Sequence, residues 1–244
     1  MMNIRQIGTG PATIVWAHGW GHSGEAFAPL AQSLAGIATS YLIDFPGHGA
    51  TPPPPEAWGT REFADAAAQF LKTLPAPAAL WVGHSFGCRV GIQLAAHYPG
   101  LFRKLALIAP AGLRRRRTMF QKISHNARVY TFKTLKHMVP EGPRRDALRA
   151  RFGSSDYRRA GVLRDSFVRI VNEDLGQEAE QIACPTLIVV GANDRDTPPE
   201  MAHRLHAKIH GSQLHVLDGF DHNGILGAGR HQVAALIQTF LDEA

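Results

Sequence analysis

Short apolar runs alternate with longer stretches of helical pattern along most of this 244-residue chain. Most of the runs are apolar at nearly every position, which is typical of strands buried on both faces of a parallel sheet. They predict strands at residues 13–17, 41–43, 80–82, 105–109, 186–190 and 213–217, with an edge strand expected within 2–7. The intervening patterns predict helices near residues 26–34, 61–74, 86–98, 199–210 and 231–241. This alternation predicts an α/β fold with a mostly parallel, doubly wound sheet.

One segment, residues 113–180, breaks the alternation because it shows three helical stretches and no strand pattern. In the third stretch the apolar residues are spaced as on one face of a helix, and Gly176 is expected to end it. The residues of that face are Leu163, Phe167, Ile170, Val171 and Leu175. We therefore predict a helical cap at 113–180, inserted after the strand near 105–109 into an α/β core of 1–112 and 181–244.

The net charge of +6 is concentrated in the predicted cap. Residues 113–178 contain 16 Lys and Arg against 7 Asp and Glu, a net charge of +9, so the rest of the chain carries −3. Such an asymmetry favours an acidic partner or an acidic substrate. Four consecutive arginines at 114–117 have no nucleic-acid-binding motif beside them, so nucleic acid is not an expected partner.

The chain shows no membrane or secretion signal. No apolar run approaches the roughly 20 residues of a membrane span, and the N-terminus lacks a basic segment followed by an apolar core. Cys88 and Cys184 provide no disulfide framework and are expected to be reduced, buried residues. These features predict a cytoplasmic enzyme with no membrane partner.

The residues Gly83-His84-Ser85-Phe86-Gly87 directly follow one predicted strand and precede a helical pattern. A G-x-S-x-G sequence in that context predicts a nucleophile elbow, a sharp turn that strains the central residue and exposes its hydroxyl. Glycines are expected on both sides because a Cβ there would collide with the neighbouring strand or helix. Ser85 is therefore the predicted nucleophile, and a turn with an incidental serine is the alternative.

A serine hydroxyl needs a base to remove its proton and an acid to orient that base. In such folds the partners follow in the order Ser, Asp, His, each just beyond a strand. Asp194 follows the strand at 186–190 and His222 follows the strand at 213–217, which predicts them as acid and base. Asp196 is the second candidate for the acid, and both aspartates could instead cap the turn. His84 is expected to pack beneath the turn rather than to act as the base.

A serine that transfers an acyl group also requires N–H donors for the oxyanion that develops on the carbonyl oxygen. Phe86 supplies one donor as the residue after the nucleophile, and the second is expected in the loop after an earlier strand. Trp20 is our candidate there, because Gly19 before it lets the backbone come close. A simple turn at His18-Gly19 is the alternative.

Three histidines in the helical pattern near 199–210 are spaced as metal ligands can be. Apolar residues mark the opposite, buried face of that helix, so the histidines are expected to face solvent. No metal and no cofactor is therefore predicted. The histidines are His203, His206 and His210.

The chain resembles the α/β-hydrolase superfamily over nearly its full length. The motifs that carry this resemblance are His18-Gly19-Trp20, Asp44-Phe45-Pro46-Gly47-His48-Gly49, the elbow at 83–87, Gly191-x-x-Asp194 and Asp221-His222. The resemblance implies a serine hydrolase, because the dehalogenase and epoxide-hydrolase branches have aspartate in the elbow. It does not specify the acyl chain or the alcohol.

The start of the chain, up to His18-Gly19-Trp20-Gly21, resembles the pimeloyl-acyl-carrier-protein methyl ester esterases. That family has a basic helical cap that docks an acidic carrier protein. The resemblance thus implies a carboxylic-ester hydrolase that acts on an acyl ester, such as a methyl ester on acyl carrier protein. The elbow differs, since those enzymes typically have Trp in place of His84. A hydrolase of C–C bonds in ring-cleavage products and a non-catalytic binding protein are the alternative functions; the C–C hydrolases typically have Asn before the serine.

In the predicted cap, we expect the apolar helical face to cover Ser85 and to bind an acyl chain. Arginines are expected to meet an anion at the entrance, because the planar guanidinium binds carboxylate and phosphate in pairs. The alternative is a solvated helix surface. The arginines are Arg144, Arg145, Arg158 and Arg159.

Overall fold

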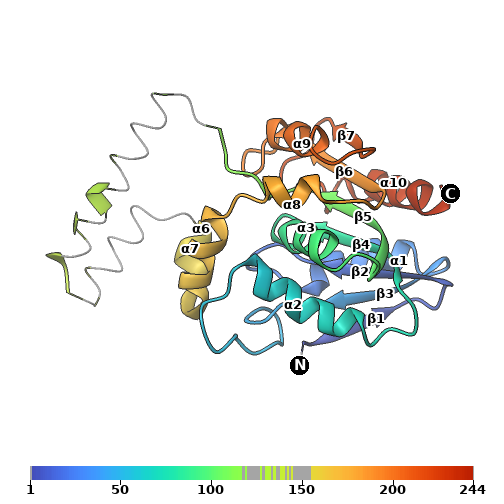
Figure 1. The fold of residues 1–244 in the computed structure, drawn as a ribbon, viewed down its shortest axis with the longest axis horizontal. Helices are drawn as coiled ribbons and strands as arrows, with labels where there is room; N and C mark the ends of the chain where they lie inside the picture. Colours follow the sequence, from blue (N-terminus) through green and yellow to red (C-terminus); the bar gives the residue numbers. More distant parts are fainter. Residues whose placement is uncertain are drawn as a thin grey trace.

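The computed structural model describes residues 2–116 and 155–243, together with residues 119, 127, 130–132, 134, 135, 138–140, 142 and 144. Within these residues a sheet of seven strands runs through the molecule in the order β1-β3-β2-β4-β5-β6-β7 (Figure 1). β1 pairs antiparallel with β3 at one edge, and the other neighbours are parallel. The strands are β1 (Ile4–Ile7), β2 (Ala12–Ala17), β3 (Ala38–Ile43), β4 (Ala78–His84), β5 (Phe102–Ile108), β6 (Thr186–Gly191) and β7 (Gln213–Leu217).

Helices cover both faces of this sheet (Figure 1). The α-helices whose bounds the structure describes are α1 (Ala28–Ser33), α2 (Thr60–Leu71), α3 (Phe86–His97), α6 (Ser155–Arg159), α7 (Arg164–Asn172), α8 (Gly176–Glu180), α9 (Pro199–His206) and α10 (Arg230–Asp242), with 3-10 turns η1 (Gly24–Phe27) and η2 (Gly161–Leu163). In the described part of the chain no helix has the length and apolar character that a membrane span needs.

The two faces of the sheet form two hydrophobic cores. Along β2, Val15 and Ala17 pack with α2, α3, α8 and α9, whereas Ile14 and Trp16 pack with α1 and α10. Successive side chains of a strand point to opposite faces, so a strand in the middle of this sheet must be apolar at nearly every position. This confirms the reading of continuous apolar runs as central strands and the prediction of an α/β fold.

The predicted elements are present, but some of their ends differ. β3 begins three residues before the apolar pattern, because parallel pairing with β2 extends to Ala38. α9 ends at His206 rather than at residue 210. The prediction that Gly176 ends the third helical stretch is wrong: α7 ends at Asn172, and Gly176 is the first residue of α8. Val171 is 46% exposed, so among the described residues it is not part of the buried face of α7.

The described part of residues 113–180 is tied to the core next to α2. The Glu173 carboxylate after α7 accepts hydrogen bonds from the Thr60 N–H, at 3.2 Å to each oxygen, and from the Thr60 hydroxyl. Near the start of α7, the Ser166 hydroxyl accepts a hydrogen bond of 2.9 Å from the Trp58 N–H. The bonds from Thr60 satisfy donors in the first turn of α2, where a helix has N–H groups without internal partners, and the bond from Trp58 fixes the chain just before that helix. They fix α7 in place beside α2 (Figure 1).

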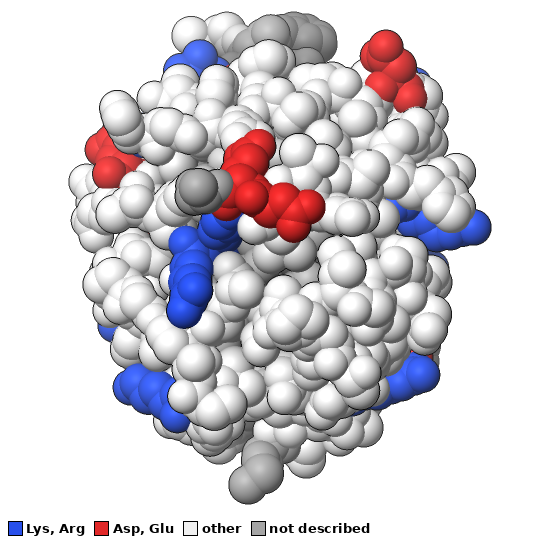
Figure 2. Space-filling model, turned by 90° about the vertical axis from the view of Figure 1, so that its right-hand side faces the viewer, with Lys and Arg blue, Asp and Glu red and all other residues white. Residues whose placement is uncertain are grey.

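Few charged side chains lie on the face of the molecule that is turned away from α6 and α7 (Figure 2). Figure 2 shows the face near the C-terminal helix, turned away from α6 and α7, and its charged side chains are few, scattered and of both signs. The excess of positive charge therefore does not come from this face.

Candidate active site

Ser85 lies in a tight turn between β4, which ends at His84, and α3, which begins at Phe86. Its backbone has φ 50° and ψ −103°, a conformation that non-glycine residues rarely adopt and that costs of order 1–3 kcal/mol. The Ser85 N–H donates a 3.1 Å hydrogen bond to the carbonyl of Ile108 at the end of β5. The neighbouring strand thus holds the strained turn at the carboxyl edge of the sheet.

The two glycines of the turn permit close backbone packing. A Cβ at Gly83 would lie 2.5 Å from the main chain of Gly87, and a Cβ at Gly87 would lie 2.0 Å from the carbonyl oxygen of Ala17. Both distances are too short for any side chain. The helix therefore begins in direct contact with β2 and β4, as the sequence argument for these glycines predicted.

Asp194 and His222 meet across the ends of β6 and β7. The Nδ1–H of His222 donates to Oδ2 of Asp194 at 2.8 Å. Asp194 is 3% exposed, and the side chain of His222 is 14% exposed. Because parallel strands end at the same edge of a sheet, both residues lie at the edge that also carries Ser85.

Further donors fix the Asp194 carboxylate. Its Oδ1 accepts hydrogen bonds from the N–H groups of Asp196, at 2.9 Å, and Thr197, at 2.8 Å. The Thr197 hydroxyl lies 2.9 Å from Asp194 Oδ2 and 3.2 Å from His222 Nδ1. Thr197 was not among the predicted site residues, although an aspartate side chain that accepts N–H groups from the next residues of its own turn is a common local pattern.

The environment moves the pKa values of this pair apart. Burial raises the pKa of Asp194, but the hydrogen bond and the charge of His222 and the bonds from Thr197 outweigh it, so the pKa lies below its ordinary value. Burial lowers the pKa of His222, but the hydrogen bond and the charge of Asp194 outweigh burial. The charges of Asp196 and Asp156 add to this, and the pKa of His222 is raised. The pair can thus stabilise a proton taken up by His222.

The two aspartates considered for the acid occupy different positions. Asp194 is buried and bonded to His222, whereas Asp196 is exposed and contributes its main-chain N–H to the turn. Both aspartates and His222 are among the described residues, and of the two only Asp194 lies within hydrogen-bond distance of His222. The expected turn-capping role is also present, since Asp194 accepts both N–H groups of its own turn.

The loop after β2 lies against the nucleophile turn. A Cβ at Gly19 would lie 2.8 Å from Nδ1 of His84 and 3.5 Å from Cβ of Ser85. This approach brings the main chain of Trp20 close to Ser85. The main chain of Phe86 is also close, because Phe86 directly follows Ser85 as the first residue of α3. Among the described residues, neither the Trp20 nor the Phe86 N–H donates a hydrogen bond to the protein, so both are able to donate to a negatively charged oxygen of a bound substrate.

The side chain of His18 holds this loop in place through hydrogen bonds to the main chain. Its Nδ1–H donates to the Gly19 carbonyl at 2.7 Å, and its Nε2 accepts from the Phe45 N–H at 3.1 Å. Burial lowers the pKa of His18 to about 3, with a further contribution from His48. His18 is therefore a neutral structural residue with both ring nitrogens in use.

Aromatic rings line the approach to the turn from the side of α7. The Trp20 ring contacts the rings of His48, at 4.8 Å between centroids, Phe86, at 5.4 Å, and Phe167, at 5.3 Å. Phe167 belongs to α7, so the described part of the predicted cap contributes to this apolar wall. Such a surface suits the hydrocarbon part of a substrate.

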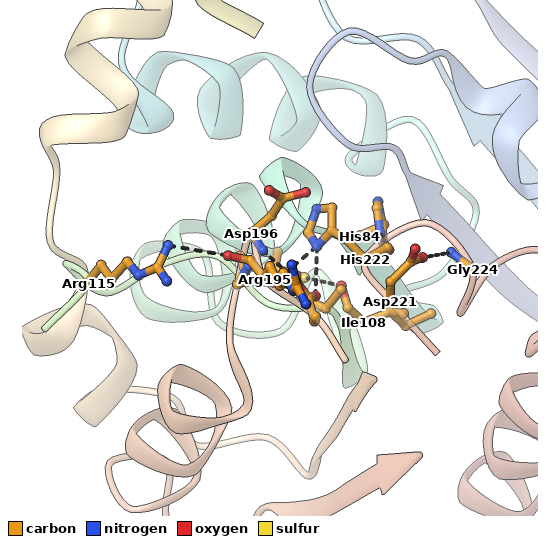
Figure 3. Close-up of polar contacts among 12 residues, drawn as sticks. His84, Ile108, Arg115, Arg195, Asp196, Asp221, His222 and Gly224 are labelled. Atoms are coloured by element: carbon orange, nitrogen blue, oxygen red, sulfur yellow. Dashed lines mark hydrogen bonds and ion pairs between the residues drawn. The ribbon is translucent and has the colours of Figure 1, made fainter. Parts of the chain in front are cut away.

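An open hollow of about 600 Å³ lies beside His222. The loops after β6 and β7 line it, and Arg195 and Asp221 are among its residues. Arg115 reaches the same loop and donates a 3.3 Å hydrogen bond to the Arg195 carbonyl (Figure 3). The hollow gives solvent access to His222.

The predicted anion-binding arginines are exposed where the structure describes them. Arg144, Arg158 and Arg159 are exposed, and Arg145 lies outside the described residues. Their proposed role in recognition therefore stays a prediction. His203 and His206 on α9 and His210 after its end are exposed, as expected. In the described ranges, no group of three His, Cys, Asp or Glu residues is arranged to hold a metal ion.

Comparisons with known proteins place these features in context. A sequence model of the alpha/beta hydrolase family matches residues 14–236. The pimeloyl-[acyl-carrier protein] methyl ester esterase of Xanthomonas campestris pv. campestris (strain B100) is 32% identical over 98% of this chain and 98% of its own length. The esterase of that name from Chromobacterium violaceum is 32% identical over 80% of each chain. A solved esterase from Exiguobacterium antarcticum superposes with a TM-score of 0.77 over 99% of this chain and 96% of the other; at 20% identity it shows the shared fold alone.

Proposed function

This chain belongs to the α/β-hydrolase family and is a carboxylesterase-type ester hydrolase, and from that premise we propose that Ser85, His222 and Asp194 are its catalytic triad. The observation that carries the proposal is the hydrogen bond between the buried Asp194 and His222, at the edge of the sheet where the strained Ser85 lies. The relatives are named esterases, which favours ester hydrolysis over C–C cleavage or binding without turnover.

In the first half of the reaction, Ser85 Oγ attacks the carbonyl carbon of the ester while His222 takes up the hydroxyl proton. The negative charge moves to the carbonyl oxygen, where the N–H groups of Trp20 and Phe86 stabilise it. Asp194 stabilises the positive charge on His222. When the tetrahedral intermediate collapses, His222 returns the proton to the departing alcohol and Ser85 carries the acyl group.

The second half repeats this chemistry with water. His222 removes a proton from a water molecule, which enters from the hollow beside it, and the resulting hydroxide attacks the acyl group on Ser85. The second tetrahedral intermediate releases the carboxylic acid and restores the Ser85 hydroxyl. Each half requires His222 to be neutral at its start.

The triad is tested by labelling with a fluorophosphonate probe, which reacts only with an activated serine, and by hydrolysis of p-nitrophenyl butyrate. Ser85→Ala should abolish labelling, and both Ser85→Ala and His222→Ala should lower kcat roughly 10³-fold or more. Equal labelling of wild type and Ser85→Ala would disprove the assignment of the nucleophile.

For the substrate, we propose a methyl ester at the end of an acyl chain that is carried by acyl carrier protein. The names of the two relatives and the net charge of +9 over residues 113–178 support this choice. The predicted cap at 113–180 would then bind the acyl chain with its apolar face. Arg144, Arg145, Arg158 and Arg159 would bind anionic groups of the carrier. The proposal includes a cytoplasmic location, which suits the two free thiols.

The substrate is tested by comparing a carrier-bound methyl ester with a small neutral ester at two salt concentrations. The Debye length shrinks from about 10 Å at 0.1 M to about 3 Å at 1 M, so salt should lower kcat/KM only for the carrier-bound ester. Charge reversal to Glu at Arg158 and Arg159 should reproduce this selective loss at low salt. Arg103→Glu is the matched control for each single reversal, Arg158→Glu or Arg159→Glu, since Arg103 is exposed at the start of β5, far from the carboxyl edge. Equal effects on both esters would show that the cap arginines do not take part in substrate recognition.

A further inference from the structure

We propose that His84 is a positioning residue that sets the distance between the nucleophile turn and the catalytic histidine. This inference rests on the proposed triad. His84 directly precedes Ser85, and its ring lies beside the ring of His222, with 4.9 Å between centroids (Figure 3). Its Nε2 is 2.9 Å from the main-chain carbonyl oxygen of His222. One side chain of the turn is therefore bonded to the backbone of the base.

The surroundings of His84 determine its protonation. A carbonyl oxygen only accepts, so the Nε2 of His84 carries the hydrogen and donates it. Nδ1 faces the main chain of Gly19, where a Cβ would lie only 2.8 Å away. His84 is 2% exposed, and burial, together with the charge of His222, lowers its pKa to about 3. His84 is thus neutral in the folded protein over the pH range of the assay and donates through Nε2, so it is not a second base.

The loop that carries His222 needs such a contact. Most of its neighbours on the loop are exposed, including Asp221 and Asn223 on either side. The N–H of Asn193 binds the Phe220 carbonyl at 3.0 Å and the Gly224 N–H binds the Asp221 carboxylate at 2.7 Å, but these bonds do not involve His222. The side chain of His222 is held by Asp194.

The main chain of His222 is held by His84, so the two contacts together leave the imidazole little freedom. Loss of the His84 donor would leave a carbonyl without its partner and permit the loop to shift. A displacement of about 1 Å at a reacting group can cost on the order of 10²-fold in rate. The loss should appear in kcat, because a small ester makes no contact with the buried His84.

The experiment compares His84→Gln, whose amide can donate from nearly the same position, with His84→Leu, which cannot donate. The readouts are kcat and KM for p-nitrophenyl butyrate between pH 5.5 and 9, together with thermal unfolding. Ile237→Ala, a truncation in the core under α10, controls for a general loss of stability. His84→Met replaces His84→Leu if the latter does not fold.

We expect His84→Leu to lower kcat about 10- to 100-fold with KM within about 2-fold. The acidic limb of its pH profile, where activity rises as His222 loses its proton, should move to lower pH as His222 loosens from Asp194. His84→Gln should retain kcat within about 3-fold, and its acidic limb should lie at the same pH as in wild type. A kcat for His84→Leu within about 2-fold of wild type, or a loss equal in His84→Gln and His84→Leu without a change in the limb, would overturn the inference. Ser85→Ala and His222→Ala run in the same assay: activity retained by these variants would instead disprove the triad itself.

Discussion

Acid should destabilise this protein through two buried histidines next to the nucleophile turn. His18 holds the loop that carries Trp20, and His84 lies between that loop and His222. Burial lowers the pKa of each to about 3, against 6.5 in an exposed histidine. Both residues are neutral in the folded protein at pH 5, whereas the unfolded chain binds a proton at each.

The magnitude follows from this difference in proton binding. The free energy of unfolding falls by about 1.36 kcal/mol for each proton and each pH unit below the unfolded pKa. At pH 5.0, which is 1.5 units below 6.5, each histidine lowers it by about 2 kcal/mol, and the two together by about 4 kcal/mol relative to pH 7.5. The stabilisation is complete above pH 6.5 and is lost as the pH falls.

Other groups whose pKa values are shifted change the free energy of unfolding less between pH 7.5 and 5.0, or change it in the opposite direction. The pKa of His48 is also lowered by burial, so its contribution has the same sign. The pKa of His222 is raised, so its contribution is present below pH 6.5 and is lost as the pH rises through the folded pKa. The lowered pKa values of Asp44 and Asp194 affect stability only as the pH falls below about 4.

Urea unfolding of wild type and His84→Gln at pH 7.5, 6.5 and 5.0 measures this effect. Wild type should lose about 4 kcal/mol of unfolding free energy through the two histidines, and His84→Gln about 2 kcal/mol less, because one proton-binding group is gone. Parallel curves for the two proteins would refute the reasoning, since they would mean that His84 binds its proton equally well in the folded and unfolded chains.

Three further predictions concern the site. Asp194→Asn should lower kcat by orders of magnitude, because Asp194 makes the hydrogen bond to His222, whereas Asp196→Asn should lower kcat by less than about 3-fold. A severe loss of kcat in Asp196→Asn with a mild loss in Asp194→Asn would mean that Asp196 is the catalytic acid. The rise of kcat/KM with pH should have an apparent pKa above 6.5, and Asp196→Asn should move it down; a limb at or below 6.5 in wild type would contradict the raised pKa of His222. Gly87→Ala should destabilise the fold by about 1–3 kcal/mol or more in thermal unfolding, because its Cβ would collide with β2. Gly36→Ala, where a Cβ meets open space, should have little effect.

Local patterns predicted the elements better than their ends. The apolar runs located every parallel strand of the described chain. For the inner strands the reason is burial on both faces, which demands apolar side chains at consecutive positions, whereas the edge strand β7 is only partly buried. The end of α7 was misplaced by four residues, at Gly176 instead of Asn172. Glu173 leaves the helix there to bind Thr60, which is distant in sequence, so no local signal could reveal it.

The same division holds for the site. By itself, the sequence determined a parallel α/β sheet and placed Ser85, Asp194 and His222 after strands in the order of a serine hydrolase, because these features depend on local spacing and on burial. Only the tertiary structure decided that Asp194 rather than Asp196 meets His222. Likewise, it alone revealed the contact of His84 with His222, which joins positions 138 residues apart. Such contacts depend on how separate strand ends come together at one edge of the sheet, and no local pattern contains that information.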